Sequence, residues 1–392
     1  MSVVDLIVVL LAAFAAYRGW RRGFVRQVFE YGGGFAGLLL GIWLGPIVAS
    51  AVTDGGIGGA LVSLVIVFIG LSLGQAIGFV LGHHVGTAAA NAKLGQADSF
   101  LGAAFGIAIT LVSFWLVGSL LLSGPSKPVA KALKHSNILK LVSDALPRPP
   151  NLFAYIQHYL NTSNFPQVFA GFPRSVGPPV KLPSGEVAQK AARAAQASTV
   201  RVVMPACGGL QLGSGWVSAP STVVTNAHVV AGGSDVTVQD SAGRHPGQVV
   251  LFDPRTDIAV IHAVGLAGPP LRLDDTDEDP GTPGATLGYP GNANGTLVIH
   301  RAAVQDTFDA SGYDIYGRAD VTRHIYEIRS IVRQGDSGGP FVLPSGEVAG
   351  VVFAASTTDD DTGYVLTGRE VADEVAAGAS RTEAVSTRGC TR

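Results

Sequence analysis

A serine in a glycine-rich turn is the first residue of this sequence whose surroundings could do chemistry. Ser337 lies in the run RQGDSGGPFV, which extends from Arg333 to Val342. Such a run can be no more than a tight β-turn, because glycine adopts backbone angles that other residues avoid and serine is common in turns. A serine hydroxyl becomes a nucleophile only when an imidazole accepts its proton and a carboxylate orients that imidazole. Ser337 is therefore a candidate nucleophile only if the chain supplies both partners.

A histidine and an aspartate stand in suitable settings in the same half of the chain. His228 lies in TNAHVV, directly after an apolar run, and Asp257 opens the apolar run DIAVIHA. The order His, Asp, Ser is one of the orders in which such triads occur. The chain thus supplies one candidate for each role.

The glycines beside Ser337 have a second use. In GDSGG the small residues let the backbone N–H groups of Gly335 and Ser337 point at one spot. Two such donors can hold the oxyanion of a tetrahedral intermediate. The sequence therefore predicts an oxyanion hole formed by Gly335 and Ser337.

Short β-branched runs surround these motifs. They include TVRVVM, STVVTNA and VAGVVFAAS, and turn residues separate them. Many short strands at close spacing predict an all-β barrel or sandwich of roughly 200 residues.

Residues 186–392 resemble the trypsin-like serine proteases through TNAHVV, DPRTDIAV and QGDSGGP, which occur in the family's order. The resemblance implies a chymotrypsin/trypsin-like double β-barrel that hydrolyses peptide bonds. It further implies that His228 is the general base and then the acid, that Asp257 orients it, and that Ser337 is the nucleophile.

The resemblance also indicates a specificity pocket, formed by Ile331, Phe353 and Ala355. Ile331 stands six positions before the nucleophile, where cation-selective members carry an acid, so the pattern does not favour a cationic residue at the cleaved position. In digestive members a new Ile-Val-Gly-Gly N-terminus pairs with the aspartate before the nucleophile. No such segment occurs here, so the group that neutralises Asp336 is left open.

The first third of the chain is far more apolar than the rest. The whole chain is 47% hydrophobic and only 14% charged, and its net charge of −2 gives no case for binding nucleic acid. Segments of about 20 apolar residues are long enough to cross a membrane. The sequence has four of them, at Val3–Trp20, Gly32–Val52, Gly59–Gly82 and Phe100–Leu122.

Positive charges set the predicted orientation of these spans. Cytoplasmic connections carry an excess of Lys and Arg, and the first helix usually dominates. Four arginines lie at the end of the first span or just after it, at Arg18, Arg21, Arg22 and Arg26. The N-terminus and everything after the fourth span are therefore expected outside the cytoplasm, although four lysines follow that span as well.

Glycines recur at every fourth position of the second and third spans. They are Gly33, Gly37, Gly41 and Gly45 in one and Gly70, Gly74, Gly78 and Gly82 in the other. This spacing lets two helices approach closely, so we expect helix packing rather than a transport path. We expect Asp5, near the chain start, to be a solvated helix cap.

The N-terminal third, with VVDLIVVLLAAFAAYRGWRRGFVRQ, resembles the colicin V production protein family. The four-span bundle joined to a trypsin-like domain is similar to the MarP-like acid-resistance proteases of actinobacteria. That resemblance implies a multi-pass inner-membrane enzyme with its protease domain in the periplasm, acting in acid or envelope stress. It implies protein substrates of the cell envelope, including cell-wall hydrolases, and contact with membrane lipid. The alternative is a catalytically silent protease fold that regulates a membrane transporter.

A proline-rich stretch joins the two parts. It includes LPRPPN and VGPPVKLPSG, and proline interrupts regular structure. We expect a tether with short helices near residues 128–141 and 151–160. The predicted domains are a transmembrane domain at 1–122, an extracytoplasmic linker at 123–185 and a protease domain at 186–392.

Cys207 and Cys390 are the two cysteines of the chain, and both follow the fourth span. Outside the cytoplasm disulfides form and persist, so we expect a bond between them rather than two unrelated thiols. We expect no cofactor and no metal. His83 and His84, at the end of the third span, are interpreted as marking the membrane interface.

Overall fold

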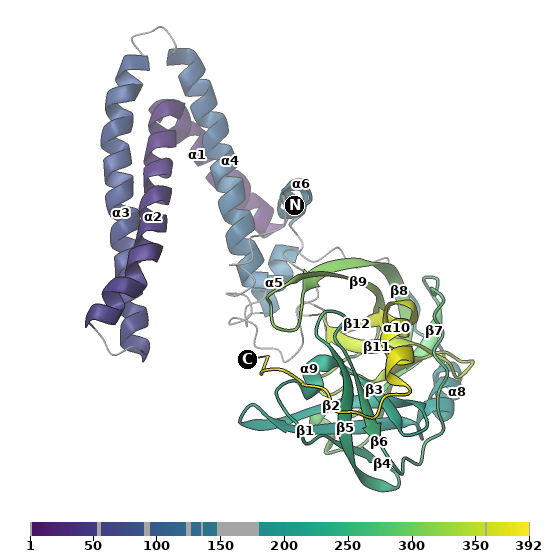
Figure 1. Cartoon of the computed structure of the whole chain (residues 1–392). Helices are drawn as coiled ribbons and strands as arrows, with labels where there is room; N and C mark the ends of the chain where they lie inside the picture. The colour runs from purple at the N-terminus through teal and green to yellow at the C-terminus, as the bar shows by residue number, and fades with distance from the viewer. Residues whose placement is uncertain are drawn as a thin grey trace. The chain divides into compact units, whose positions relative to one another are not determined.

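The structure is a computed structural model that describes residues 2–52, 56–89, 95–122, 127–134, 136–146, 180–356 and 359–391 (Figure 1). The chain divides into two compact units. One comprises residues 1–117 with 136–145, and the other comprises residues 118–135 with 146–392.

Long apolar helices make up most of the first unit. They are α1 (Val3–Arg22), α2 (Phe24–Val52), α3 (Gly56–Ala89) and α4 (Gly95–Leu122). Within the described residues, these four helices are long and apolar enough to cross a membrane. A helix suits this role because it satisfies its backbone hydrogen bonds within the segment. Large side chains such as Leu10, Phe35 and Trp43 are more than half exposed, as lipid-facing residues are. The prediction of four apolar spans is confirmed.

The glycine ladder brings α2 and α3 into backbone contact. A Cβ added to Gly37 would overlap the carbonyl oxygen of Gly70, and one added to Gly74 would overlap that of Gly33. Apolar helices associate in this way because small residues let their backbones meet without a hydrophobic driving force. The ladder is therefore a packing surface.

Asp5 is buried, so the prediction of a solvated cap is wrong in part. Its carboxylate does form a capping box with Ser2 at the start of α1. It also accepts a hydrogen bond from the Ser136 hydroxyl (2.6 Å) and one from the Ile138 N–H (3.2 Å), and Asp5 is only 1% exposed. Residues 131 positions away in the sequence thus cover the cap.

Two short helices follow α4, at α5 (Lys127–Lys134) and α6 (Asn137–Ala145). The single helix expected at 128–141 is therefore interrupted. Ser136 is the N-cap of α6, because its hydroxyl accepts a hydrogen bond from the Leu139 N–H (3.2 Å). A new helix therefore begins after it. The helix expected at 151–160 lies outside the described residues.

Two closed antiparallel barrels form the core of the second unit. Helix α8 (Gly185–Ala195) precedes them, and Ser184 caps it by accepting from the Val187 N–H. The first barrel has the strand order β1-β2-β3-β6-β5-β4. Its strands are β1 (Thr199–Ala206), β2 (Gly209–Ala219), β3 (Thr222–Thr225), β4 (Thr237–Asp240), β5 (Gly243–Asp253) and β6 (Ile258–Ala263), with the short helix α9 (Ala227–Val230) after β3.

The second barrel has the order β10-β11-β12-β9-β8-β7. Its elements are β7 (Pro283–Gly288), the 3₁₀ turn η2 (Gly291–Ala293), β8 (Val298–Tyr313), β9 (Asp320–Arg329), β10 (Pro340–Val342), β11 (Val348–Ala355), β12 (Thr362–Thr367) and the helix α10 (Gly368–Gly378). The predicted double β-barrel is confirmed. Closure leaves neither sheet with a free edge.

One hydrophobic cluster joins the two barrels. It contains Trp216 of β2, Leu287 of β7 and Phe353 of β11, all almost completely buried. Alanines of α8, including Ala191, pack into the same cluster. This shared cluster can therefore fix the two barrels relative to each other, and with them the side chains that each barrel carries.

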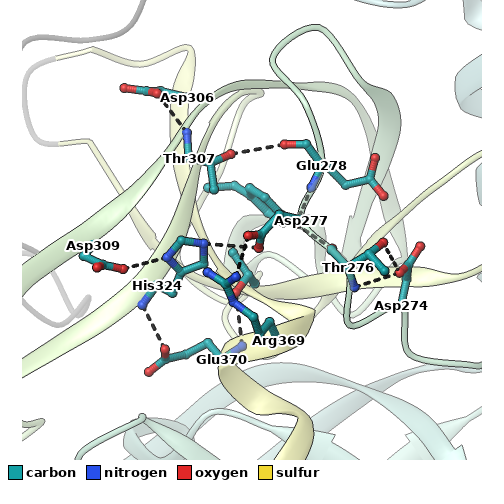
Figure 2. Close-up of polar contacts among 12 residues, drawn as sticks. Asp274, Thr276, Asp277, Glu278, Asp306, Thr307, Asp309, His324, Arg369 and Glu370 are labelled. Carbon is teal, nitrogen blue, oxygen red and sulfur yellow. Dashed lines mark hydrogen bonds and ion pairs between the residues drawn. The ribbon is translucent and has the colours of Figure 1, made fainter.

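Charged side chains tie the start of α10 to the second barrel (Figure 2). Arg369 forms an ion pair with Asp277 (2.8 Å). The His324 ring lies between two carboxylates, 2.6 Å from Asp309 and 3.2 Å from Asp277. The His324 N–H donates to Glu370 (2.9 Å). These ion pairs and hydrogen bonds thus connect four segments at one place: the segment between the barrels, β8, β9 and α10.

Candidate active site

His228 is positioned by the turn that follows β3. The apolar strand ends at Thr225, and His228 lies in the first turn of α9. Its N–H donates to Asp257 Oδ1 (2.9 Å), and its ring Nδ1 lies 2.8 Å from Asp257 Oδ2. Two hydrogen bonds from one residue to one carboxylate fix both the backbone and the ring. With Nδ1–H bonded to the carboxylate, Nε2 is left to accept a proton.

Asp257 is completely buried at the entry to β6. Its φ of 63° lies in the left-handed region, which is costly for a residue other than glycine. Its carbonyl oxygen accepts from Asn226 Nδ2 (2.8 Å) and from the Ala227 N–H (3.1 Å). These bonds hold the strained backbone in place, so the carboxylate faces His228.

The loop that carries Ser337 needs glycine at two positions. Gly335 has a φ of 103° and Gly338 one of 84°. Among the described residues, the N–H groups of Gly335 and Ser337 have no protein acceptor, whereas those of Asp336, Gly338 and Gly339 do. The acceptors are the carbonyls of Arg333, Val352 and Asp336. Within the run Gly335–Gly339, the two N–H groups predicted to form an oxyanion hole are thus the two without an acceptor among the described residues.

Ser337 and His228 line the same pocket. The cavity measures about 430 Å³, and Gly335 also contributes to its wall. The described residues include no hydrogen bond between the Ser337 hydroxyl and the His228 ring. Such bonds are often long before substrate binds. The pocket therefore brings together every residue predicted for the triad and the oxyanion hole, with Asp257 reaching it through His228.

The residues predicted for specificity do not line this cavity. Ile331, Phe353 and Ala355 are not among its lining residues. Phe353 is completely buried in the cluster between the barrels, while Ile331 is 38% exposed. The lining includes the β1–β2 hairpin, with Leu210 and Leu212. Sequence reasoning missed this hairpin, although the adjacent glycines Gly208 and Gly209 are a turn signal.

A disulfide joins Cys207 to Cys390, as expected from the cysteine count. The S–S distance is 2.08 Å and the Cα atoms are 5.8 Å apart. Cys207 and Gly208 form the two-residue turn of the β1–β2 hairpin, with φ angles of 58° and 74°. Cys207 also lines the active-site pocket, and so does Thr391 of the tail. The bond therefore fixes the C-terminal tail to one wall of the pocket.

Asp336, next to Ser337, is buried with one oxygen unpaired. Its Oδ2 accepts from the Arg333 N–H (2.8 Å), while Oδ1 has no hydrogen-bond partner among the described residues. Burial raises the pKa of Asp336 to about 6, and the Arg333 N–H and positive charge oppose this only in part. Protonation in mild acid is thus one way in which this group is neutralised.

Comparison with known proteins places the chain. The colicin V production protein family matches residues 4–147, and the trypsin-like peptidase domain matches residues 213–351. The chain is 37% identical to Serine protease Rv3671c of Mycobacterium tuberculosis over 397 residues, 99% of this chain and 98% of that protein. It belongs to the same family of serine proteases.

A crystal structure of this family agrees with the fold. The active form of the Rv3671c protease, 37% identical, superposes with a TM-score of 0.53 and covers 58% of this chain and 100% of that one. A putative serine protease, HhoB of Synechocystis, is 29% identical over 157 residues, which cover 39% of this chain and 37% of the length of HhoB. The chain is thus a trypsin-like serine protease of the Rv3671c family that acts on proteins. Its apolar helices and colicin V match indicate a membrane anchor.

Proposed function

We propose that this protein is a membrane-anchored serine endopeptidase that uses His228, Asp257 and Ser337 as its triad. The observation that carries the proposal is one pocket lined by His228, Gly335 and Ser337, in which His228 pairs with Asp257 and the N–H groups of Gly335 and Ser337 have no acceptor among the described residues. Each component of acyl transfer has a candidate there: nucleophile, base, orienting carboxylate and oxyanion donors.

Acylation follows from this arrangement. The Ser337 oxygen attacks the carbonyl carbon of the peptide bond while its proton passes to His228 Nε2. Asp257, bonded to Nδ1–H at 2.8 Å, stabilises the imidazolium. The new oxyanion receives hydrogen bonds from the Gly335 and Ser337 N–H groups. His228 then gives the proton to the leaving nitrogen as the C–N bond breaks, and an ester on Ser337 is left.

Deacylation reuses the same groups. A water molecule gives a proton to His228 and attacks the ester carbon. The oxyanion is held by the same two N–H groups, and His228 returns the proton to the Ser337 oxygen as the ester C–O bond breaks. The products are a peptide carboxylic acid and the regenerated serine.

We place the protease domain outside the cytoplasm, in the periplasm. The arginines after the first span favour this orientation, and the Cys207–Cys390 bond suits an oxidising compartment. The domains proposed are the membrane domain at 1–122, the linker at 123–185 and the protease at 186–392. The role proposed is acid and envelope stress resistance through cleavage of envelope proteins, including cell-wall hydrolases, beside membrane lipid.

The catalytic proposal is tested with Ser337→Ala and His228→Ala in the full chain, purified in detergent. Each should lower kcat for a fluorescent protein substrate by about 10⁴- to 10⁶-fold, and the double variant should lose little more, because the triad acts as a unit. Ser218→Ala is the matched control, since its hydroxyl lies on β2 without a hydrogen-bond partner among the described residues. Near-normal turnover by His228→Ala would contradict the assignment.

A second measurement separates the enzyme from the alternative function. A fluorophosphonate should label the wild-type chain on Ser337 and fail to label Ser337→Ala. A folded wild-type chain that is neither labelled nor active would favour the catalytically silent regulator. For the cellular role, cells carrying Ser337→Ala should survive acid less well, and N-terminal sequencing of envelope fragments should identify the substrates.

A further inference from the structure

Ser214 connects the first barrel to the loop that carries the nucleophile. It lies on β2 and is completely buried. Its hydroxyl donates to the Gly335 carbonyl (2.7 Å) and accepts from the Tyr289 N–H (2.8 Å). Its N–H donates to the Ser337 carbonyl (2.7 Å). Three hydrogen bonds of one first-barrel residue therefore reach the second barrel, and two of them end on the candidate oxyanion-hole residues.

The contact with Gly335 bears on the direction of its N–H. Glycine at a φ of 103° has other conformations of similar energy, so the neighbouring peptide groups must be held for this one to persist. On one side, the Gln334 carbonyl accepts from the Gly291 N–H (2.9 Å). In a trans peptide the N–H points opposite to the carbonyl, so this bond turns the Gly335 N–H away from Gly291.

On the other side, the Ser214 hydroxyl holds the Gly335 carbonyl. Rotation of that peptide group would break the 2.7 Å bond and leave a buried carbonyl without a partner. The Ser214 N–H simultaneously holds the carbonyl of Ser337. Both residues that present free N–H groups are thus anchored through their own carbonyls to one serine.

Ser214 also reaches toward the histidine. Its carbonyl accepts from the Thr225 hydroxyl (2.7 Å), and Thr225 is the last residue of β3 before the turn with His228. The Ser214 carbonyl oxygen packs directly against Gly338, where an added Cβ would overlap it. One residue is therefore bonded to the segments that precede the base and flank the nucleophile.

We infer that Ser214 is a positioning residue that sets the oxyanion hole and aligns it with His228. This inference rests on the proposed function of the same site. Ser214 does not touch the substrate; it acts through Gly335 and Ser337.

The test compares Ser214→Ala with Ser218→Ala in the full chain. Removal of a whole oxyanion donor costs roughly 100- to 1,000-fold in kcat, so loss of its anchor should cost about 10- to 100-fold. KM should stay within about 2-fold, because the substrate still binds. The affinity for a peptide boronate, which places an oxygen in the hole, should fall in parallel with kcat. Ser218→Ala should match the wild type.

Several outcomes would overturn the inference. They are a kcat within about 3-fold of wild type, a loss confined to KM, or a normal kcat per site once fluorophosphonate-labelled sites are counted. The last outcome would mean that Ser214 only supports folding. If Ser214→Ala does not fold, Ser214→Cys keeps the volume with a weaker donor, and full kcat and boronate affinity in that folded variant would equally overturn it.

Labelling and activity of the wild-type chain distinguish a failure of the proposed triad from a failure of the positioning role of Ser214. A wild type that is labelled and active while Ser214→Ala is unchanged overturns the positioning role and leaves the triad standing. A folded wild type that is neither labelled nor active overturns both.

Discussion

Two buried aspartates flank the candidate nucleophile, one from each barrel, and their surroundings differ. Both carboxylate oxygens of Asp257 accept hydrogen bonds from His228. Asp336 is only 5% exposed, yet one of its oxygens has no partner among the described residues. A buried charge is costly unless it is hydrogen-bonded. The first barrel therefore supplies a carboxylate whose two oxygens are both hydrogen-bonded, and the second holds one whose pKa is raised by burial to about 6.

The same contrast extends to the backbone. The first-barrel half of the site is fixed by side chains and by a covalent bond at Cys207. The second-barrel half depends on glycine conformations at Gly335 and Gly338 and on peptide hydrogen bonds. Substitutions in the first-barrel half are therefore expected to lower activity or stability, whereas Asp336→Asn in the second-barrel half is expected to raise stability.

Among changes to the two aspartates and the disulfide, the largest effect is expected from Asp257→Asn. The change keeps the volume but stabilises the wrong tautomer of His228, so kcat should fall by about 10⁴-fold while the melting temperature changes little. Kinetics and thermal unfolding of the full chain measure this. Asp240→Asn is the matched control, because Asp240 pairs with His245 in the same barrel at 2.8 Å. Loss of activity in both variants would contradict a special role for Asp257.

An intermediate effect is expected from removal of the disulfide. Cys207→Ser with Cys390→Ser should lower the free energy of unfolding by about 2 to 4 kcal/mol. Activity should fall before the barrels unfold, because the bond fixes a wall of the pocket. Reductant should act on the wild type and leave the double variant unchanged. Mass spectrometry that finds two free thiols in oxidised, active enzyme would refute this expectation.

The smallest effect, of opposite sign, is expected from Asp336→Asn. The folded pKa of Asp336 is about 6 and the ordinary value is 3.8, so the native state binds more protons between these values. Stability from this group therefore rises as pH falls from about 6 to about 4 and is lost as pH rises. The difference between the two pKa values corresponds to about 3 kcal/mol of unfolding free energy, which the charged Asp336 removes above pH 6. In Asp336→Asn the new side-chain amide is buried without a partner, which offsets about 1 kcal/mol of the gain. The variant should gain about 2 kcal/mol at pH 7.

Denaturant unfolding at several pH values checks this prediction. The gain of Asp336→Asn over wild type should shrink as the pH falls toward about 4, where Asp336 is protonated. Asp306→Asn, an aspartate elsewhere on the second barrel, is the control. A gain that is independent of pH would show that the buried charge is not the cause.

Residue patterns within short segments were sufficient to predict much of this protein. The apolar spans, the closely spaced strands and the motifs around His228, Asp257 and Ser337 are local features of the sequence. The disulfide followed from a count of two cysteines. The positive φ angles at Gly335 and Gly338 agree with the residue type, because glycine is the residue that adopts such angles most readily.

Contacts between distant segments were beyond such reasoning. The hydroxyl of Ser214 bonds to a residue 121 positions away, and GSGW alone gives no sign of it. Asp5 was expected in solvent because it lies near the start of the chain, but Ser136 and Ile138 cover it. Phe353 was expected to line a specificity pocket, which stays a prediction, and its place in the cluster between the barrels could not be read from the sequence. Each case depends on which segments meet after folding.

The bond between Cys207 and Cys390 closes a covalent ring, because it joins residues 183 positions apart. All strands from β2 to β12 lie inside this ring, and β1 precedes it. A single cut within the ring leaves both pieces attached until the bond is reduced, whereas a cut before Cys207 releases everything that follows. Electrophoresis with and without reductant therefore distinguishes an internally nicked protease from one that has been freed from its anchor.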